Sequence, residues 1–272
     1  PLLLKIMDND YIKLKDIKPV LTGYIRQAAI LLHRSPSPDE KAVHDIRVLM
    51  KKSRAVLRLI TSQIDAEFYE REYNSFREVG RIMSVWRETS VHRKTLKDLK
   101  KKNKELFNQL SGNQKIENLM LKNETSPEPD KEVNERMELI DEHLSKAGYR
   151  LRFQTMNSLD PKSLIKELEN TYQRAVGSYV ICRHNPKQEN IHLFRKRAKD
   201  LLYQLWFFRP VNPASIKNLE KRLDSLTQNL GKHNDLSVLL KTLEYKYTGT
   251  GTVSDHSMDK LAVIIRTEQD RY

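Results

Sequence analysis

Several residue types are scarce in this 272-residue sequence. It has one cysteine, Cys182, which excludes a disulfide framework within the chain. It has only 8 glycines and 10 prolines and no long alternating run of β-branched residues, so little in it favours β-strands. No apolar run approaches the roughly 20 residues that a membrane-spanning helix needs. These absences favour a helical protein of a reducing compartment.

Positive charge is what the sequence has in excess. Lysine and arginine number 49 against 36 acidic residues, which gives a net charge of +13. Hydrophobic residues make up 38% and charged residues 31%, a composition typical of a soluble globular protein. The excess charge favours a polyanionic partner, which can be a nucleic acid, an acidic membrane surface or a phosphate polymer.

Apolar residues recur at helical spacing along most of the chain. The polar, proline-containing stretch 121–132 and the glycine-containing stretch 249–257 are expected loops. The expected helices cover residues 12–33, 39–62, 66–83, 88–110, 132–147, 161–183, 187–208, 214–230, 236–247 and 257–269.

Two of these helices carry a row of basic residues beside their apolar face. We call the row in VHDIRVLMKKSRAVLRLI, residues 43–60, the first stripe, and the row in IHLFRKRAKDLLYQLWFF, residues 191–208, the second stripe. Spacings of three and four residues gather each row on one side of its helix. A solvated outer face is the simplest interpretation of one such row, but these rows contain almost no acidic residues.

The two stripes are parts of an expected internal duplication. His44, Arg47 and Lys51 correspond to His192, Arg195 and Lys199 at an offset of about 148 residues. Helix starts at Ser37, Pro38 and Glu40 and at Asn185, Pro186 and Gln188 show the same offset. After the stripes, MSVWRETSV (83–91) aligns with LGKHNDLSV (230–238), as two turns with Arg87-Glu88 opposite Asn234-Asp235. We therefore expect two related halves, with the stripes facing each other across a pseudo-twofold axis.

This doubled pattern resembles the CHAD family (conserved histidine α-helical domain). The resemblance implies an all-α fold of two four-helix bundles related by pseudo-twofold duplication, with a basic central groove that binds inorganic polyphosphate. We expect residues 1–125 to form the first half, 126–159 a connecting excursion with one helix, and 160–272 the second half, together one CHAD domain. The resemblance also implies a non-enzymatic, cytoplasmic protein that can associate with polyphosphate granules.

The resemblance assigns polyphosphate contacts to the basic positions of both halves. The second half departs from the family pattern at Asp200 and Leu202, where basic residues are usual, and at Trp206, where an acid is common. It also has Asn234 in place of an arginine in its turn. The expected contacts are His44, Arg47, Lys51, Lys52, Arg54, Arg58, Arg87, His192, Arg195, Lys196, Lys199 and Tyr203.

The two histidines are the candidates for a metal site. Arg47 and Arg195 occupy the positions three residues further on, where a second ligand would lie, so charge repulsion opposes a metal ion. We expect no metal and no cofactor. Each histidine can instead donate a hydrogen bond to phosphate or pack in the first turns of its helix.

Two other function classes stay open. A helical nucleic-acid-binding protein is the first, although the stripes offer few aromatic residues for base stacking besides Tyr203 and Trp206. An enzyme or regulator of phosphate-polymer metabolism is the second. No P-loop, nucleophile elbow or paired acid/base motif supports catalysis. Glu88 and Asp235 better fit residues that orient an arginine or cap a helix.

A third basic row lies between the two stripes in the sequence. It consists of Lys94, Lys97, Lys101 and Lys104, with apolar residues on the opposite side of the helix. This row can extend a polyanion surface, or it can be a solvated outer face. The sequence favours neither.

Overall fold

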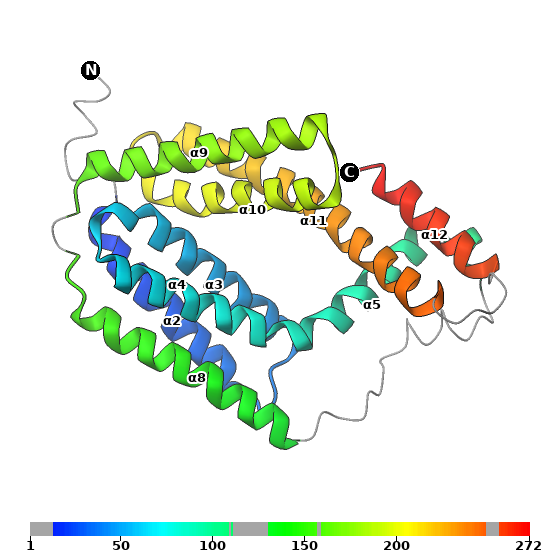
Figure 1. The fold of residues 1–272 in the computed structure, drawn as a ribbon, viewed down its shortest axis with the longest axis horizontal. Helices are drawn as coiled ribbons and strands as arrows, with labels where there is room; N and C mark the ends of the chain where they lie inside the picture. The colour runs from blue at the N-terminus through cyan, green and yellow to red at the C-terminus, as the bar shows by residue number, and fades with distance from the viewer. Residues whose placement is uncertain (1–12, 109, 111–129, 157–158, 249–255) are drawn as a thin grey trace. The chain divides into compact units, whose positions relative to one another are not determined.

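The computed structural model describes residues 13–108, 110, 130–156, 159–248 and 256–272 (Figure 1). These residues form helices and connecting turns, and none of them is in a β-strand. The expected all-α class is therefore confirmed.

The chain divides into two compact units. Unit 1 combines residues 1–85 with 129–227, and unit 2 combines residues 86–128 with 228–272. Each unit therefore draws on both of the expected sequence halves. The internal duplication itself stays a prediction.

Four helices of unit 1 form a bundle: α2 (Ile17–Leu32), α3 (Glu40–Leu59), α4 (Ala66–Ile82) and α8 (Asp130–Phe153). α3 packs against α2 and α4, and α8 packs against the same two helices (Figure 1). Apolar side chains such as Leu21, Ile46, Met50 and Phe76 are almost completely buried. The excursion expected at 126–159 thus supplies a structural member of this bundle, and its helix is longer than the sequence suggested.

The second group of unit 1 helices follows α8 in the chain. α9 (Pro161–His184) packs on α10 (Gln188–Leu205), which continues into the short helix η3 (Trp206–Phe208). α11 (Pro213–Thr248) contributes its first part, up to Thr227, to this unit. α10 also packs on α3, where Gln204 Nε2 donates a buried hydrogen bond of 2.9 Å to the carbonyl of Ala55. This contact joins the helices that carry the two stripes.

Unit 2 has its own apolar core. It contains α5 (Ser84–Lys102) from Trp86 onward, α6 (Lys104–Asn108), the second part of α11, and α12 (His256–Gln269). Leu96 and Leu99 from α5, Leu239 from α11, and Leu261 and Ile265 from α12 form the centre of this core.

The two stripe helices begin two residues later than expected at their caps. Asp39, not Ser37, is the N-cap of α3, because its extended backbone lets the carboxylate accept a 2.6 Å hydrogen bond from the Ala42 amide. α10 begins after Lys187, while Asn185 ends α9 and donates its amide to the Ile181 carbonyl. The corrected caps, Asp39 and Lys187, still differ by 148 residues.

The turn expected at 230–238 is absent, because α11 runs through it without interruption. No proline removes a backbone donor there, and Gly231 costs a helix only about 1 kcal/mol. Ser237 donates its hydroxyl to the His233 carbonyl within the helix, and Leu236 and Leu239 pack in the unit 2 core. The other expected turn, at 83–91, is reduced to a break at Met83 between α4 and α5. Packing therefore overrides the polar composition of both segments.

The helix expected over 88–110 starts earlier and is divided in two. α5 begins at Ser84 and ends at Lys102, and α6 follows from Lys104. Asn103 lies between them, and its side-chain amide donates to the Leu99 carbonyl at 3.1 Å. This local hydrogen bond competes with continuation of the helix.

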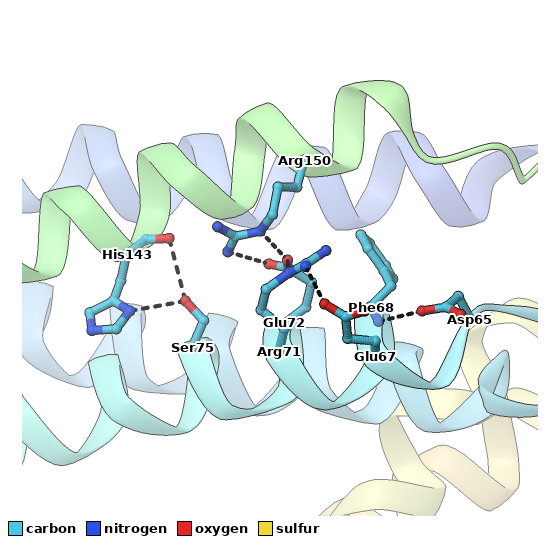
Figure 2. A network of polar contacts seen from close by, with 8 residues as sticks. All are labelled: Asp65, Glu67, Phe68, Arg71, Glu72, Ser75, His143 and Arg150. Carbon is cyan, nitrogen blue, oxygen red and sulfur yellow. Dashed lines mark hydrogen bonds and ion pairs between the residues drawn. The ribbon is translucent and has the colours of Figure 1, made fainter.

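A buried ion pair fixes α8 on α4 (Figure 2). Glu72 of α4 is 2% exposed and accepts two hydrogen bonds from the guanidinium of Arg150 of α8, one of them at 3.0 Å. Arg71 Nε lies 3.4 Å from the same carboxylate. One helical turn away, Ser75 Oγ lies 3.1 Å from His143 Nδ1. The ion pair between Glu72 and Arg150 thus fixes the position of α8 relative to α4.

We predict that Glu72→Gln destabilises unit 1, because the substitution leaves the Arg150 guanidinium partly buried without its carboxylate. Loss of one partner of a buried pair costs roughly 3 kcal/mol. Urea unfolding followed by circular dichroism measures the loss. Glu67→Gln is the matched control, since Glu67 is exposed and pairs with Arg71, and it should cost less than about 0.5 kcal/mol. Equal effects of the two variants would contradict the role of the pair.

Candidate functional site

The two basic stripes lie on α3 and α10, which pack on each other in unit 1. His44, His192 and Lys196 are exposed, and the other stripe residues are partly buried. Arg87 lies on α5, in the other unit, and its side chain is outside the described residues. Packing of α3 on α10 brings Lys52 together with Lys199 and Tyr203. It also brings Arg58 together with Asp200.

Arg58 of α3 is bound inside this interface. Its Nη1 lies 2.8 Å from Asp200 Oδ1 of α10, and the two side chains are only 11% and 10% exposed. Its Nη2 donates to the hydroxyl of Tyr73 of α4, and its guanidinium lies 4.9 Å from the centre of that ring. Asp200, the departure from the family pattern, thus supplies the carboxylate that Arg58 needs. These contacts make Arg58 a structural link among three helices.

A single carboxylate serves several cations at this place. Burial raises the pKa of Asp200, and the charges of Arg58, Lys196 and Arg197 oppose that rise. Burial lowers the pKa of the neighbouring Arg54, whose guanidinium lies 5.6 Å from the Tyr73 ring centre. The interface therefore has more positive than negative charge at close range.

Arg47 is also directed at a helix of the bundle. Its Nη1 donates to the carbonyl of Gly80, in the last turns of α4. A cation near the C-terminal end of a helix interacts favourably with the carbonyl groups there. Arg47 and Arg58 together tie α3 to α4.

Two lysines from different helices converge on one tyrosine ring. The Nζ atoms of Lys52 (α3) and Lys199 (α10) lie 6.0 and 5.8 Å from the centre of the Tyr203 ring. Burial lowers the pKa of Lys52, and the charge of Lys199 lowers it further. Lys199 Nζ also lies 3.1 Å from Asp224 Oδ1. An anion placed here would relieve the repulsion between the two ammonium groups.

The hydroxyl of Tyr203 keeps its proton. Burial raises the pKa of Tyr203 to about 12, so the phenol is neutral at ordinary pH and adds no negative charge beside the lysines. A neutral phenol can donate a hydrogen bond to an anionic oxygen.

These residues open into a pocket of about 400 Å³ between α2, α3, α10, η3 and the first part of α11. Four lining residues are cationic and two are acidic. The acids face cations, since Glu220 bonds Arg209 at 2.9 Å and Asp224 pairs with Lys199. The pocket is lined by Tyr24, Lys52, Leu202, Tyr203, Trp206, Arg209, Lys217, Glu220, Lys221 and Asp224.

Sequence reasoning missed most of the pocket. Lys217 is exposed on α11, and it lines the pocket beside Lys221. The available signal was the spacing of Lys217, Lys221 and Asp224, which places them on one side of α11. Nothing in the sequence indicated that this side faces Lys52 of α3.

The remaining candidates are reported for the described part of the chain. It contains no cluster of three His, Cys, Asp or Glu side chains arranged to hold a metal ion. None of its helices combines the length and apolar character that crossing a membrane requires. The lysine row of α5 and α6 is exposed in unit 2, and its role stays open.

Comparison with protein families matches the chain to the CHAD domain over residues 25–244. The chain belongs to the CHAD family. Polyphosphate binding is a general property of this family. The match includes both stripes and every pocket residue except Tyr24. No curated protein matches the chain.

We predict that Arg58 and Asp200 stabilise this CHAD domain only when both are present. Asp200→Asn should lower stability by roughly 3 kcal/mol, because it leaves a buried guanidinium without its counter-ion. Asp224→Asn is the control: its carboxylate is 47% exposed, and its loss should cost less than about 1 kcal/mol.

A double-mutant cycle separates the pair from its surroundings. Apolar replacement of both partners, Arg58→Met with Asp200→Leu, should recover most of the stability that either single change loses. Urea unfolding of the four proteins measures the coupling. Single losses that simply add would contradict a direct interaction.

Proposed function

We propose that this CHAD domain binds inorganic polyphosphate, without catalysis, along the cationic surface of α3 and α10. The observation that carries the proposal is the convergence of Lys52 and Lys199 from the two helices on Tyr203, at the edge of a pocket that continues to Lys217 and Lys221. The family membership supports the same ligand.

A long polyanion suits this surface better than a small one. α3 has 20 residues and is therefore about 30 Å long, so its stripe can contact several phosphates in succession. Each contact relieves repulsion among the cations of the stripe and releases counter-ions from the polymer. The neutral Tyr203 hydroxyl can add a hydrogen bond to a phosphate oxygen.

The expected contacts divide into two kinds in this proposal. Arg47 and Arg58 hold α3 against its neighbours and act by positioning the stripe. The groups proposed to reach the polymer are the remaining ones on the two stripes and in the pocket. They are His44, Lys51, Lys52, Arg54, His192, Arg195, Lys196, Lys199 and Tyr203, joined by Lys217 and Lys221.

Single-stranded nucleic acid is the second candidate ligand. The observation in its favour is that Tyr24, Tyr203 and Trp206 line the pocket, because aromatic rings beside lysines can stack on bases. All three rings are partly buried, which limits their use as stacking surfaces.

We predict that long-chain polyphosphate outcompetes single-stranded DNA and RNA by at least about tenfold in affinity. The measurement is displacement of a labelled polyphosphate from the pure protein at near-physiological salt, because salt weakens all three ligands. Equal or tighter binding of DNA or RNA would contradict the proposal and favour single-stranded nucleic acid as the ligand. Release of phosphate from the polymer during incubation with Mg²⁺ would contradict the non-enzymatic part.

We further predict that charge removal weakens binding only at the site. Lys52→Gln, Lys196→Gln and Lys217→Gln should each reduce affinity roughly three- to tenfold. Each should also lower the slope of log Kd against log salt by about 0.9, the amount that corresponds to one lost phosphate contact. Lys162→Gln, an exposed change at the start of α9, should stay within about twofold. Circular dichroism checks that each variant is folded. An equal loss in Lys162→Gln would mean that attraction is diffuse and no defined site exists.

A further inference from the structure

One side of α9 presents apolar residues to solvent. Tyr172, Val176 and Val180 are 52%, 36% and 45% exposed, whereas the ring of Tyr179 packs against Phe194 of α10. The buried stripe of α9, which includes Leu164 and Ala175, is a separate side that packs in unit 1. α9 therefore has a second apolar side that its own packing does not use.

Charged residues frame this side in a regular way. At about 100° per residue, Tyr172 and Val180 lie roughly 40° to either side of Val176, and Glu169 and Arg183 lie within roughly 20° of it. All five residues are exposed. The face thus has an apolar centre, with the acidic Glu169 toward the N-terminal end of the helix and the basic Arg183 toward the C-terminal end.

The equivalent place in the first bundle shows how such a face is covered. α2 has α8 packed along it in the antiparallel direction, because Lys18 donates to the Gln154 carbonyl at 2.8 Å while His33 lies 2.8 Å from Asp141. Ile25 lies beside Gly148 midway between these polar contacts. α9 takes the place of α2 in the predicted duplication, and its exposed face has the same design, with polar ends and an apolar middle.

We propose that a second copy of this chain covers the face, with the two α9 helices antiparallel and Val176 on the twofold axis. Tyr172 and Val180 are each four residues from Val176, so Tyr172 faces Val180 of the partner subunit. Glu169 and Arg183 are each seven residues from it, so Glu169 faces Arg183 of the partner subunit. An isologous pairing of this kind satisfies both charges twice.

The expected dimer is modest in affinity. α9 has 24 residues, a length of about 36 Å, and a contact confined to one helix pair falls at the low end of specific interfaces, near 1,200 Å² of total buried area. The net charge of +13 on each chain opposes association at low salt. We expect a Kd on the order of micromolar at about 150 mM salt.

Sedimentation velocity of the full chain from about 1 to 100 μM, without polyphosphate, tests the dimer. Val176→Arg should weaken association at least tenfold, since it places two like charges at the axis. The control is Ile30→Arg, at a 61% exposed apolar position of α2, which should leave association unchanged. A monomer at every concentration, or equal effects of the two variants, would overturn the proposal. The absence of polyphosphate keeps this result separate from the proposed function.

A charge exchange identifies the antiparallel register. Glu169→Arg and Arg183→Glu should each weaken the dimer, because each creates two like-charge contacts. The double variant, with both changes in one chain, should restore association to within about threefold of the parent. Either single variant could also lose stability if the residue makes a contact within its own chain. Sedimentation at several protein concentrations separates the two effects, because weaker association depends on concentration and a folding defect does not. A double variant as weak as the singles would overturn this register.

Discussion

The contact between α3 and α10 depends on a carboxylate placed between two cationic helices. Without Asp200, the guanidinium of Arg58 would be buried against a helix that carries Arg195, Lys196 and Lys199. Removing a charge from water is costly unless a partner and hydrogen bonds compensate for it. Asp200 and Tyr73 provide both. Lys196 stays exposed on the same helix, and Lys199 pairs with Asp224 instead.

The same rule extends along the pocket. Asp224 forms a salt bridge with Lys199, and Glu220 forms one with Arg209. Each of these two cations therefore has an acidic partner. Lys52, Lys217 and Lys221 line the same space. The acidic side chains thus fix the position of two cations at the pocket, and three further lysines leave the pocket with a surplus of positive charge. A preorganised surface of this type loses little conformational freedom when it binds.

Regular features of the sequence were sufficient for the fold class and the stripes. Helical periodicity reports which side of each helix is apolar, so most helices and both basic rows could be located. Helix boundaries were less accessible: Asp39 replaced Ser37 as a cap, and α11 continued past Gly231, because side-chain hydrogen bonds and core packing decide such points. The ion pair of Arg58 and the pocket lysines of α11 could not be found, since they depend on which helix faces which.

The departures at Asp200 and Trp206 acquire a common meaning at the predicted offset of 148 residues. That offset relates Asp200 to Lys52 and Trp206 to Arg58. Arg58 and Asp200 form a salt bridge at one place on the contact between α3 and α10, whereas their counterparts Trp206 and Lys52 line the open pocket. The two places that this offset relates therefore differ, since one contains a buried salt bridge and the other lines a pocket. In the predicted duplication, substitutions at very few positions are therefore sufficient to give one half of the repeat a closed salt bridge and the other half an open pocket.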